Sequence, residues 1–235
     1  NIGLDDAYAP FGGAARMAHI IRTERARAER SMYIDTGDSF QGAPIFNAFS
    51  GEVEIRTLSA MGVDVMAIGN HDFDLGEPNL AQQVAQWANF PILAANYKFG
   101  ASQSPTPPPL AGLVQEFAMF NLDGLRVGVV GLGNVSTMST IIEAGNHMGI
   151  TPIAAAEAAQ YYIDAIRGQV DVVILATHLG LTADYELIKN ITGADIVFGG
   201  HHHVVLNPPK ALMDCQIDQM APVWRERFTA THTCT

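Results

Sequence analysis

The chain has 235 residues, of which 48% are hydrophobic and 16% charged, a composition that excludes a disordered chain and supports a substantial buried core. Its 13 Lys and Arg against 24 Asp and Glu leave a formal net charge of -11, which disfavours nucleic-acid polymers because their phosphates require a basic face. No run of 18 consecutive apolar residues occurs, so no transmembrane segment is expected.

The two cysteines exclude another set of protein classes. Cys215 and Cys234 are too few for a disulfide framework, and they show no CxxC spacing. Neither a zinc knuckle nor a thioredoxin-type redox motif is therefore expected. No signal peptide opens the chain, which begins at Asn1 rather than Met and so suggests a processed N-terminus.

The first half of the sequence alternates predicted helices and apolar strands. Gly13 to Arg30 places apolar residues on one face and five arginines elsewhere, which predicts an amphipathic helix. The following predicted elements are a strand at 31–35, helices at 45–49 and 52–61, a strand at 63–68, a helix at 79–88 started by Pro78, and a strand at 91–95 closed by Asn96.

The second half continues this alternation after a Pro-rich surface excursion at 100–112. Asp123-Gly124 predicts a hairpin between strands at 114–122 and 125–130. The remaining predicted elements are a helix capped by Thr151-Pro152 and ending near Gly168, a strand at 170–176, a helix capped by Thr182 and reaching Ile191, and a strand at 195–198. This order predicts an α/β domain whose sheet is mixed or doubled into a sandwich.

Side chains that commonly bind metals follow four of the predicted strands. They are Asp38, then Asn70 and His71, then His178, then His201 and His203. Because α/β folds place their sites at the carboxyl ends of strands, these loops are expected to converge. A carboxylate, a carboxamide and several imidazoles suit Mn, Zn, Fe or Co, whereas calcium requires oxygen ligands.

The spacing within the histidine run adds a geometric expectation. If the segment is extended, His201 and His203 point to one side and His202 to the other. His178 alone would be interpreted as a core histidine and Asp38 alone as a turn residue, but the four loops together favour a metal site. Three further histidines, His19, His147 and His232, are given a structural interpretation. The segment GVVGLGNVS at 128–136 is discounted as a dinucleotide loop because it lacks the third glycine and a clear helix start.

Four motifs in this order resemble those of the calcineurin-like metallophosphoesterases. They are TGDSFQG (36–42), GNHDFDLG (69–76), ATHLG (176–180) and GGHHHVV (199–205). More narrowly, they resemble the catalytic domain of the 5′-nucleotidase and 2′,3′-cyclic-nucleotide phosphodiesterase group. The resemblance covers about 8–210 of a single domain at 1–235, with 211–235 an unassigned tail, and implies a four-layer α/β/β/α sandwich, incomplete at both ends.

The resemblance also implies roles for the residues of these motifs. It implies a site for two divalent metal ions, of Mn, Zn, Fe, Co or Mg. Asp38 would bridge both ions, with Asn70, His178 and His201 completing one and His203 serving the other. His71 would contact the substrate phosphate and leaving oxygen, oriented by Asp74.

The function implied is metal-dependent hydrolysis of small phosphate esters, nucleotides above all. The family's Asp-x-His ligand pair has no counterpart here, since Asp5 and Asp6 have no histidine two residues later. The alternative is therefore a catalytically impaired metal-binding or structural relic. Alternative substrates are cyclic-nucleotide diesters, nucleotide sugars and thiosulfate esters, and the resemblance favours a periplasmic or extracellular location.

Overall fold

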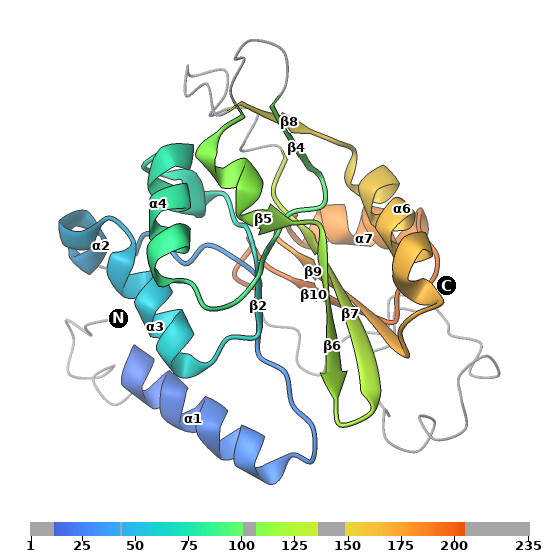
Figure 1. The fold of residues 1–235 in the computed structure, drawn as a ribbon, viewed down its shortest axis with the longest axis horizontal. Helices are drawn as coiled ribbons and strands as arrows, with labels where there is room; N and C mark the ends of the chain where they lie inside the picture. The colour runs from blue at the N-terminus through green and yellow to red at the C-terminus, as the bar shows by residue number, and fades with distance from the viewer. Residues whose placement is uncertain (1–11, 43, 101–106, 136–148, 205–235) are drawn as a thin grey trace.

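A computed structural model of the chain describes residues 12–42, 44–100, 107–135 and 149–204. Two β-sheets lie face to face in the middle, and helices cover the outer face of each, so the order of layers is α/β/β/α (Figure 1). This arrangement confirms the predicted sandwich.

The first sheet contains four parallel strands. Their order across the sheet is β1 (Ile34–Asp35), β2 (Val65–Ala67), β3 (Ile92–Leu93) and β5 (Val114–Gln115). Its outer side carries α1 (Ala14–Arg27), α2 (Pro44–Phe49), α3 (Glu52–Met61), α4 (Glu77–Trp87) and the 3-10 turn η2 (Pro109–Gly112). A second 3-10 turn, η1 (His71–Phe73), follows β2.

The second sheet is mixed. Its order is β10 (Ile196–Gly199), β9 (Val172–Thr177), β7 (Leu125–Leu132) and β6 (Phe117–Leu122), and only the β6–β7 pair is antiparallel. Helices α6 (Ala155–Arg167) and α7 (Leu181–Lys189) cover its outer face. A two-stranded antiparallel sheet of β4 (Tyr97–Phe99) and β8 (Ile150–Pro152) lies beside these layers.

Alternating side chains of β2 contribute to two hydrophobic cores, one between the sheets and one under the outer helices. Val65 and Ala67 of β2 pack between the two sheets, whereas Met66 and Ile68 pack against the outer helices. Successive residues of a strand point to opposite faces, so an uninterrupted apolar run fills both layers at once. Fully burying such a side chain contributes about 1.5–3 kcal/mol.

The strand predicted at 114–122 is wrong in one respect, because the structure divides it between the two sheets. Val114–Gln115 pairs with β3, and Phe117–Leu122 pairs with β7. The backbone oxygen of Glu116, between the two, accepts a hydrogen bond from the Gly131 amide. An apolar sequence run gives no signal of this transfer, since both halves are strand and both are partly buried.

Two predicted helix starts are also wrong. Thr151-Pro152 lies in β8, opposite Tyr97 and Lys98, because pairing with β4 prevails over a local cap, and α6 begins only at Ala155. Thr182 lies inside α7, whose N-cap is Gly180 in a backbone conformation with φ 91°.

The predicted hairpin is confirmed. The hairpin turn has positive φ at Asp123 (49°) and Gly124 (91°), as a two-residue type I′ turn requires. The strand β7 includes residues 128–132 of the discounted glycine segment.

The two cysteines, His147, His232 and the tail at 211–235 lie outside the described residues. Among the helices described, none is both long and apolar enough to span a membrane.

Candidate metal centre

The loops after four parallel strands meet at one edge of the sandwich. Asp38 follows β1, Asn70 and His71 follow β2, His178 follows β9, and His201 and His203 follow β10. Three of these side chains, Asp38, His178 and His201, place one potential ligand atom each within 4.8 Å of one another. The predicted convergence of the loops is therefore observed for the described residues.

His178 is held in an orientation suited to ligation. Its side chain is 2% exposed, and its Nδ1 lies 2.6 Å from the Thr36 carbonyl oxygen. Because a carbonyl oxygen only accepts, Nδ1 carries the proton and donates, which leaves the Nε2 lone pair free in the neutral ring.

The free nitrogen of His178 faces a carboxylate. Nε2 is buried and lies 2.9 Å from Asp38 Oδ2, so the two groups form an ion pair when the ring is protonated. In the neutral tautomer two acceptors confront each other at this distance, an arrangement that requires a proton or a cation between them. The donor set therefore fits a metal ion.

The electrostatics of this pair agree with its geometry. Burial alone would raise the pKa of Asp38, but the His178 ring and the His71 backbone amide outweigh it and lower the pKa. Burial would lower the pKa of His178, and Asp38 reverses this to raise it. Each partner thus favours the charged form of the other.

His201 and Asn70 form a second connection between loops of different sheets. Nδ1 of His201 lies 2.9 Å from Asn70 Oδ1, which leaves Nε2 of the ring available. Burial, and then the neighbouring His178 and His202, lower the pKa of His201 and favour the neutral form that binds metals.

The side chains of His71 and Asp74 are in hydrogen-bonding contact. The Nδ1 atom of His71 lies 3.0 Å from Asp74 Oδ2, and the His71 side chain is 47% exposed. The backbone amide of His71 donates to Asp38 Oδ1 over 2.7 Å. The ring is therefore oriented by a carboxylate while remaining accessible to a ligand.

The expected geometry of the histidine run is wrong. β10 ends at Gly199, and His201 and His203 have φ angles of 78° and 52°, so the segment is not extended. The ring centroids of His201 and His202 lie 5.1 Å apart, and His202 Nδ1 accepts a hydrogen bond from the Leu181 amide. A left-handed backbone at residues other than glycine costs about 1–3 kcal/mol each and is often found at functional sites.

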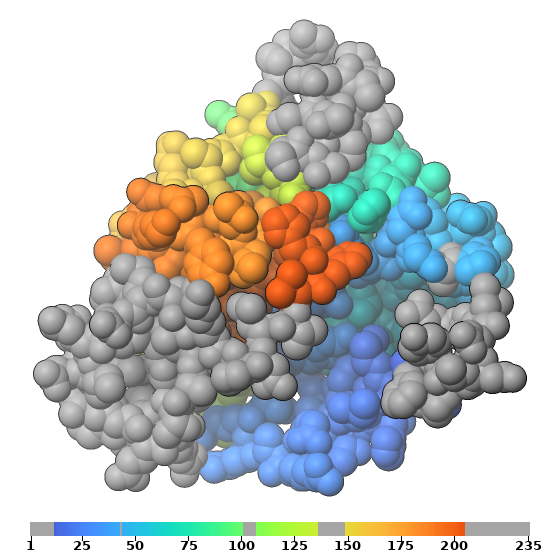
Figure 2. Space-filling view, turned by 180° about the vertical axis from the view of Figure 1, so that it is seen from behind, coloured from blue at the N-terminus to red at the C-terminus, as the bar shows by residue number. Residues whose placement is uncertain are grey.

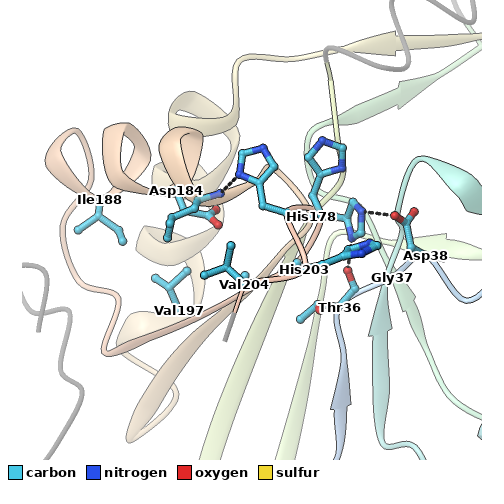
Figure 3. A pocket seen from close by; sticks show the side chains of 14 residues that line it. Thr36, Gly37, Asp38, His178, Asp184, Ile188, Val197, His203 and Val204 are labelled. Carbon is cyan, nitrogen blue, oxygen red and sulfur yellow. Dashed lines mark hydrogen bonds and ion pairs between the residues drawn. The ribbon is translucent and has the colours of Figure 1, made fainter. Parts of the chain in front are cut away.

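His203 lines the same pocket as Asp38 and His178 but is not in the cluster of three side chains (Figure 3). The pocket has a volume of about 310 Å³ and runs from this cluster toward the apolar side chains of Ile188 and Val197. The loop after β10 is exposed, and Figure 2 shows the last described residues at the surface of this face.

Two carboxyl groups beside the cluster, the buried Asp72 and the half-buried Asp35, have no role assigned from the sequence motifs. Burial raises the pKa of Asp72 to about 7, against the lowering effect of the Gly69 amide, and Asp72 is completely buried. Burial also raises the pKa of Asp35, which accepts a hydrogen bond from the Gly37 amide. Asp72 stands in GNHDFDLG between residues with assigned roles. The only feature of the sequence that could have pointed to it is an acidic residue inside a turn.

Glycines allow these loops to approach closely. A β-carbon at Gly37 would lie 2.3 Å from the Gly69 nitrogen, and one at Gly69 would lie 2.3 Å from the Asp38 nitrogen and Oδ1. The loops after β1 and β2 are therefore in direct backbone contact, which only residues without a side chain permit.

Comparisons with known proteins show which family the chain resembles. The model of the calcineurin-like phosphoesterase family matches residues 10–205. A 5′-nucleotidase of Diplobatis ommata is 32% identical over 202 residues, covering 86% of this chain and 34% of the relative. A snake venom 5′-nucleotidase of Crotalus adamanteus is 30% identical over 203 residues, covering 85% of this chain and 34% of that protein.

Solved structures show the same fold. The crystal structure of a 5′-nucleotidase precursor from Thermus thermophilus superposes with a TM-score of 0.73 at 30% identity, covering 83% of this chain and 37% of that one. The sulfate thiohydrolase SoxB of Thermus thermophilus gives 0.73 at 21% identity, covering 86% of this chain and 36% of that one, a likeness of fold alone. The chain spans about a third of the length of the curated relatives it matches.

Proposed function

The chain belongs to the calcineurin-like phosphoesterase family, and on this premise we propose that it is a hydrolase that uses divalent metal ions to cleave small phosphate esters, nucleotides above all. Family membership supports the metal-dependent chemistry. The 5′-nucleotidases among its relatives support the choice of nucleotides. The observation that carries the proposal is the buried Nε2 of His178, which lies 2.9 Å from Asp38 Oδ2 within a cluster that includes His201.

The proposed ligands divide into two sets that share one carboxylate. Asp38, Asn70, His178 and His201 would hold one ion, and Asp38 and His203 the other. Divalent cations bound there supply Lewis-acid chemistry, since they polarise phosphoryl oxygens and lower the pKa of attacking water. The carboxylate of Asp38 provides the negative charge that attracts both cations into an otherwise imidazole-rich pocket.

His71 is the proposed catalytic residue. Its Nδ1 is directed to Asp74, which leaves Nε2 to meet the substrate. A ring held in this orientation can donate a hydrogen bond or a proton to the departing oxygen. Exposure of the ring supports this role, because a purely structural histidine would be more deeply enclosed.

The pocket and the relatives support the proposed substrate and location. The pocket extends beyond the ligand cluster along apolar side chains, so it offers room for the alcohol part of an ester. A periplasmic or extracellular location is proposed from the resemblance, and a venom protein is among the relatives.

The direct test compares metal content and hydrolysis in two variants. Asp38→Ala should lose both metal binding and phosphatase activity, because no other carboxylate is proposed to serve both ions. His19→Ala is the matched control, since His19 lies exposed on α1 away from the pocket. Hydrolysis with normal metal content in Asp38→Ala would refute the assignment, and a wild-type chain that binds no ion would instead support the relic.

A substrate panel tests the finer part of the proposal. Nucleoside 5′-monophosphates should be cleaved faster than cyclic-nucleotide diesters, nucleotide sugars or thiosulfate esters. A preference for one of those alternatives would retain the metal chemistry and replace the substrate.

A further inference from the structure

We propose that Asp72 is a positioning residue that fixes the loop of Asp38 against the loop of Asn70 and His71. Its side chain is completely buried and does not line the pocket, so it has no route to substrate. The inference rests on the proposed function, because metal ions can bind only if the two loops are held in a fixed relative position.

The carboxylate of Asp72 accepts backbone amides from both loops. Oδ2 accepts hydrogen bonds from the Gly69 amide at 2.7 Å and from the Asp38 amide at 3.1 Å. Oδ1 accepts the Ser39 amide at 2.9 Å and the Phe40 amide at 3.4 Å. This single side chain therefore joins two segments that are about thirty residues apart in the chain.

The connection is reciprocal. Asp72, from the loop after β2, accepts amides of the loop after β1, and Asp38, from the loop after β1, accepts the His71 amide. Asp38 also has a left-handed backbone at φ 61°, which a residue with a side chain adopts only when its surroundings impose it. The three amides at Asp38, Ser39 and Phe40 impose it by converging on one carboxylate.

Glu77 provides a matched control. It is 2% exposed, and its carboxylate also accepts a backbone amide, that of Leu110 in η2. It joins α4 to η2 on the outer side of the first sheet and does not line the pocket. Glu77→Gln therefore perturbs a buried carboxyl group at a structural position.

The experiment measures manganese affinity by calorimetry for the wild type, Asp72→Asn and Glu77→Gln, at a temperature well below every unfolding transition. In Asp72→Asn the amide NH₂ replaces an oxygen that accepts two backbone amides. The manganese affinity of this variant should fall by about 10 to 100-fold, as happens when a partner that orients a metal ligand is removed. Glu77→Gln should lower stability yet keep affinity within about twofold. Unchanged affinity in Asp72→Asn, or an equal loss in Glu77→Gln, would overturn the proposal.

Two further measurements keep the inference decidable. Asp72→Glu retains the carboxylate but displaces it by one methylene, and it should also lose at least about tenfold in affinity, whether or not Asp72→Asn folds. Without metal, NMR signals of the His178 ring nitrogens report the Asp38 contact, and they should shift in the Asp72 variants but not in Glu77→Gln. If the wild type binds no manganese, the proposed function fails, and these ring signals alone decide the role of Asp72.

Discussion

Replacing Gly131 by Ala tests how tightly the two sheets are packed against each other. A β-carbon there would lie 2.2 Å from Cβ of Leu93 and 2.8 Å from its carbonyl atoms. The strand cannot move away easily, because the Gly131 amide donates to Glu116 and its carbonyl oxygen accepts the Ala95 amide at 2.7 Å. The clash is therefore with Cβ and the carbonyl group of Leu93, and hydrogen bonds on both sides hold the Gly131 backbone in place.

Gly128 on the same strand gives the comparison. Its β-carbon would meet Ile166 Cδ1 at 2.7 Å, the far end of a side chain that can rotate. Overpacking commonly costs about 1–3 kcal/mol, so we expect about 1 kcal/mol for Gly128→Ala and about 3 kcal/mol or more for Gly131→Ala.

Thermal and urea denaturation followed by circular dichroism measure both changes. At about 2–4 °C per kcal/mol for a chain of this size, Gly131→Ala should lower Tm by about 6–12 °C. Because both variants add one methyl group to one strand, their backbone effects are matched. A Gly128→Ala variant that is destabilised as much as Gly131→Ala would refute the explanation by sheet contact.

Other consequences concern stability, turnover and metal binding. Arg126 lowers the pKa of Asp171 to about 2, so this pair stabilises the fold above about pH 4 and loses its effect as pH falls toward 2. The destabilisation measured for Asp171→Asn should therefore disappear over that range, and a difference from wild type that persists at pH 2 would contradict it. His71→Asn should slow turnover by about 10² to 10⁴-fold with metal content intact, and Asp74→Asn by about 10 to 100-fold, whereas loss of the metal in His71→Asn would make His71 a ligand. Titration with manganese should fill two sites unequally.

The layers and the edge that carries the site could be predicted from the sequence because both depend on local signals. Apolar runs such as 63–68 and 170–176 end at polar residues, and strand ends are where α/β folds hold ligands. The structure accordingly brings Asp38, His178 and His201 together. The register and the boundaries of the strands could not be predicted in the same way, because a strand ends where its pairing partner ends. Val114–Gln115 and Phe117–Leu122, for example, pair with different strands.

The parts that sequence did not predict depend on contacts between distant segments. Asp72 interacts through backbone amides of Asp38, Ser39 and Phe40, and backbone amides have no sequence signature. The conformation of His201 was missed for a similar reason. Its ring is placed by Asn70 from the other sheet, and the backbone adopts a positive φ that spacing alone does not indicate.

Unequal filling of two metal sites follows from how the proposed ligands are distributed. Asp38, His178 and His201 present ligand atoms within 4.8 Å of one another, whereas His203 lies in the exposed loop outside that cluster. Affinity increases with the number of ligands already in place, so the first set should bind manganese much more tightly than Asp38 with His203 alone. His201→Ala should abolish the tight site, and His203→Ala should remove only the weak one. Two sites of equal affinity in the wild-type chain, or a tight site lost in His203→Ala, would show that the ligands are divided differently.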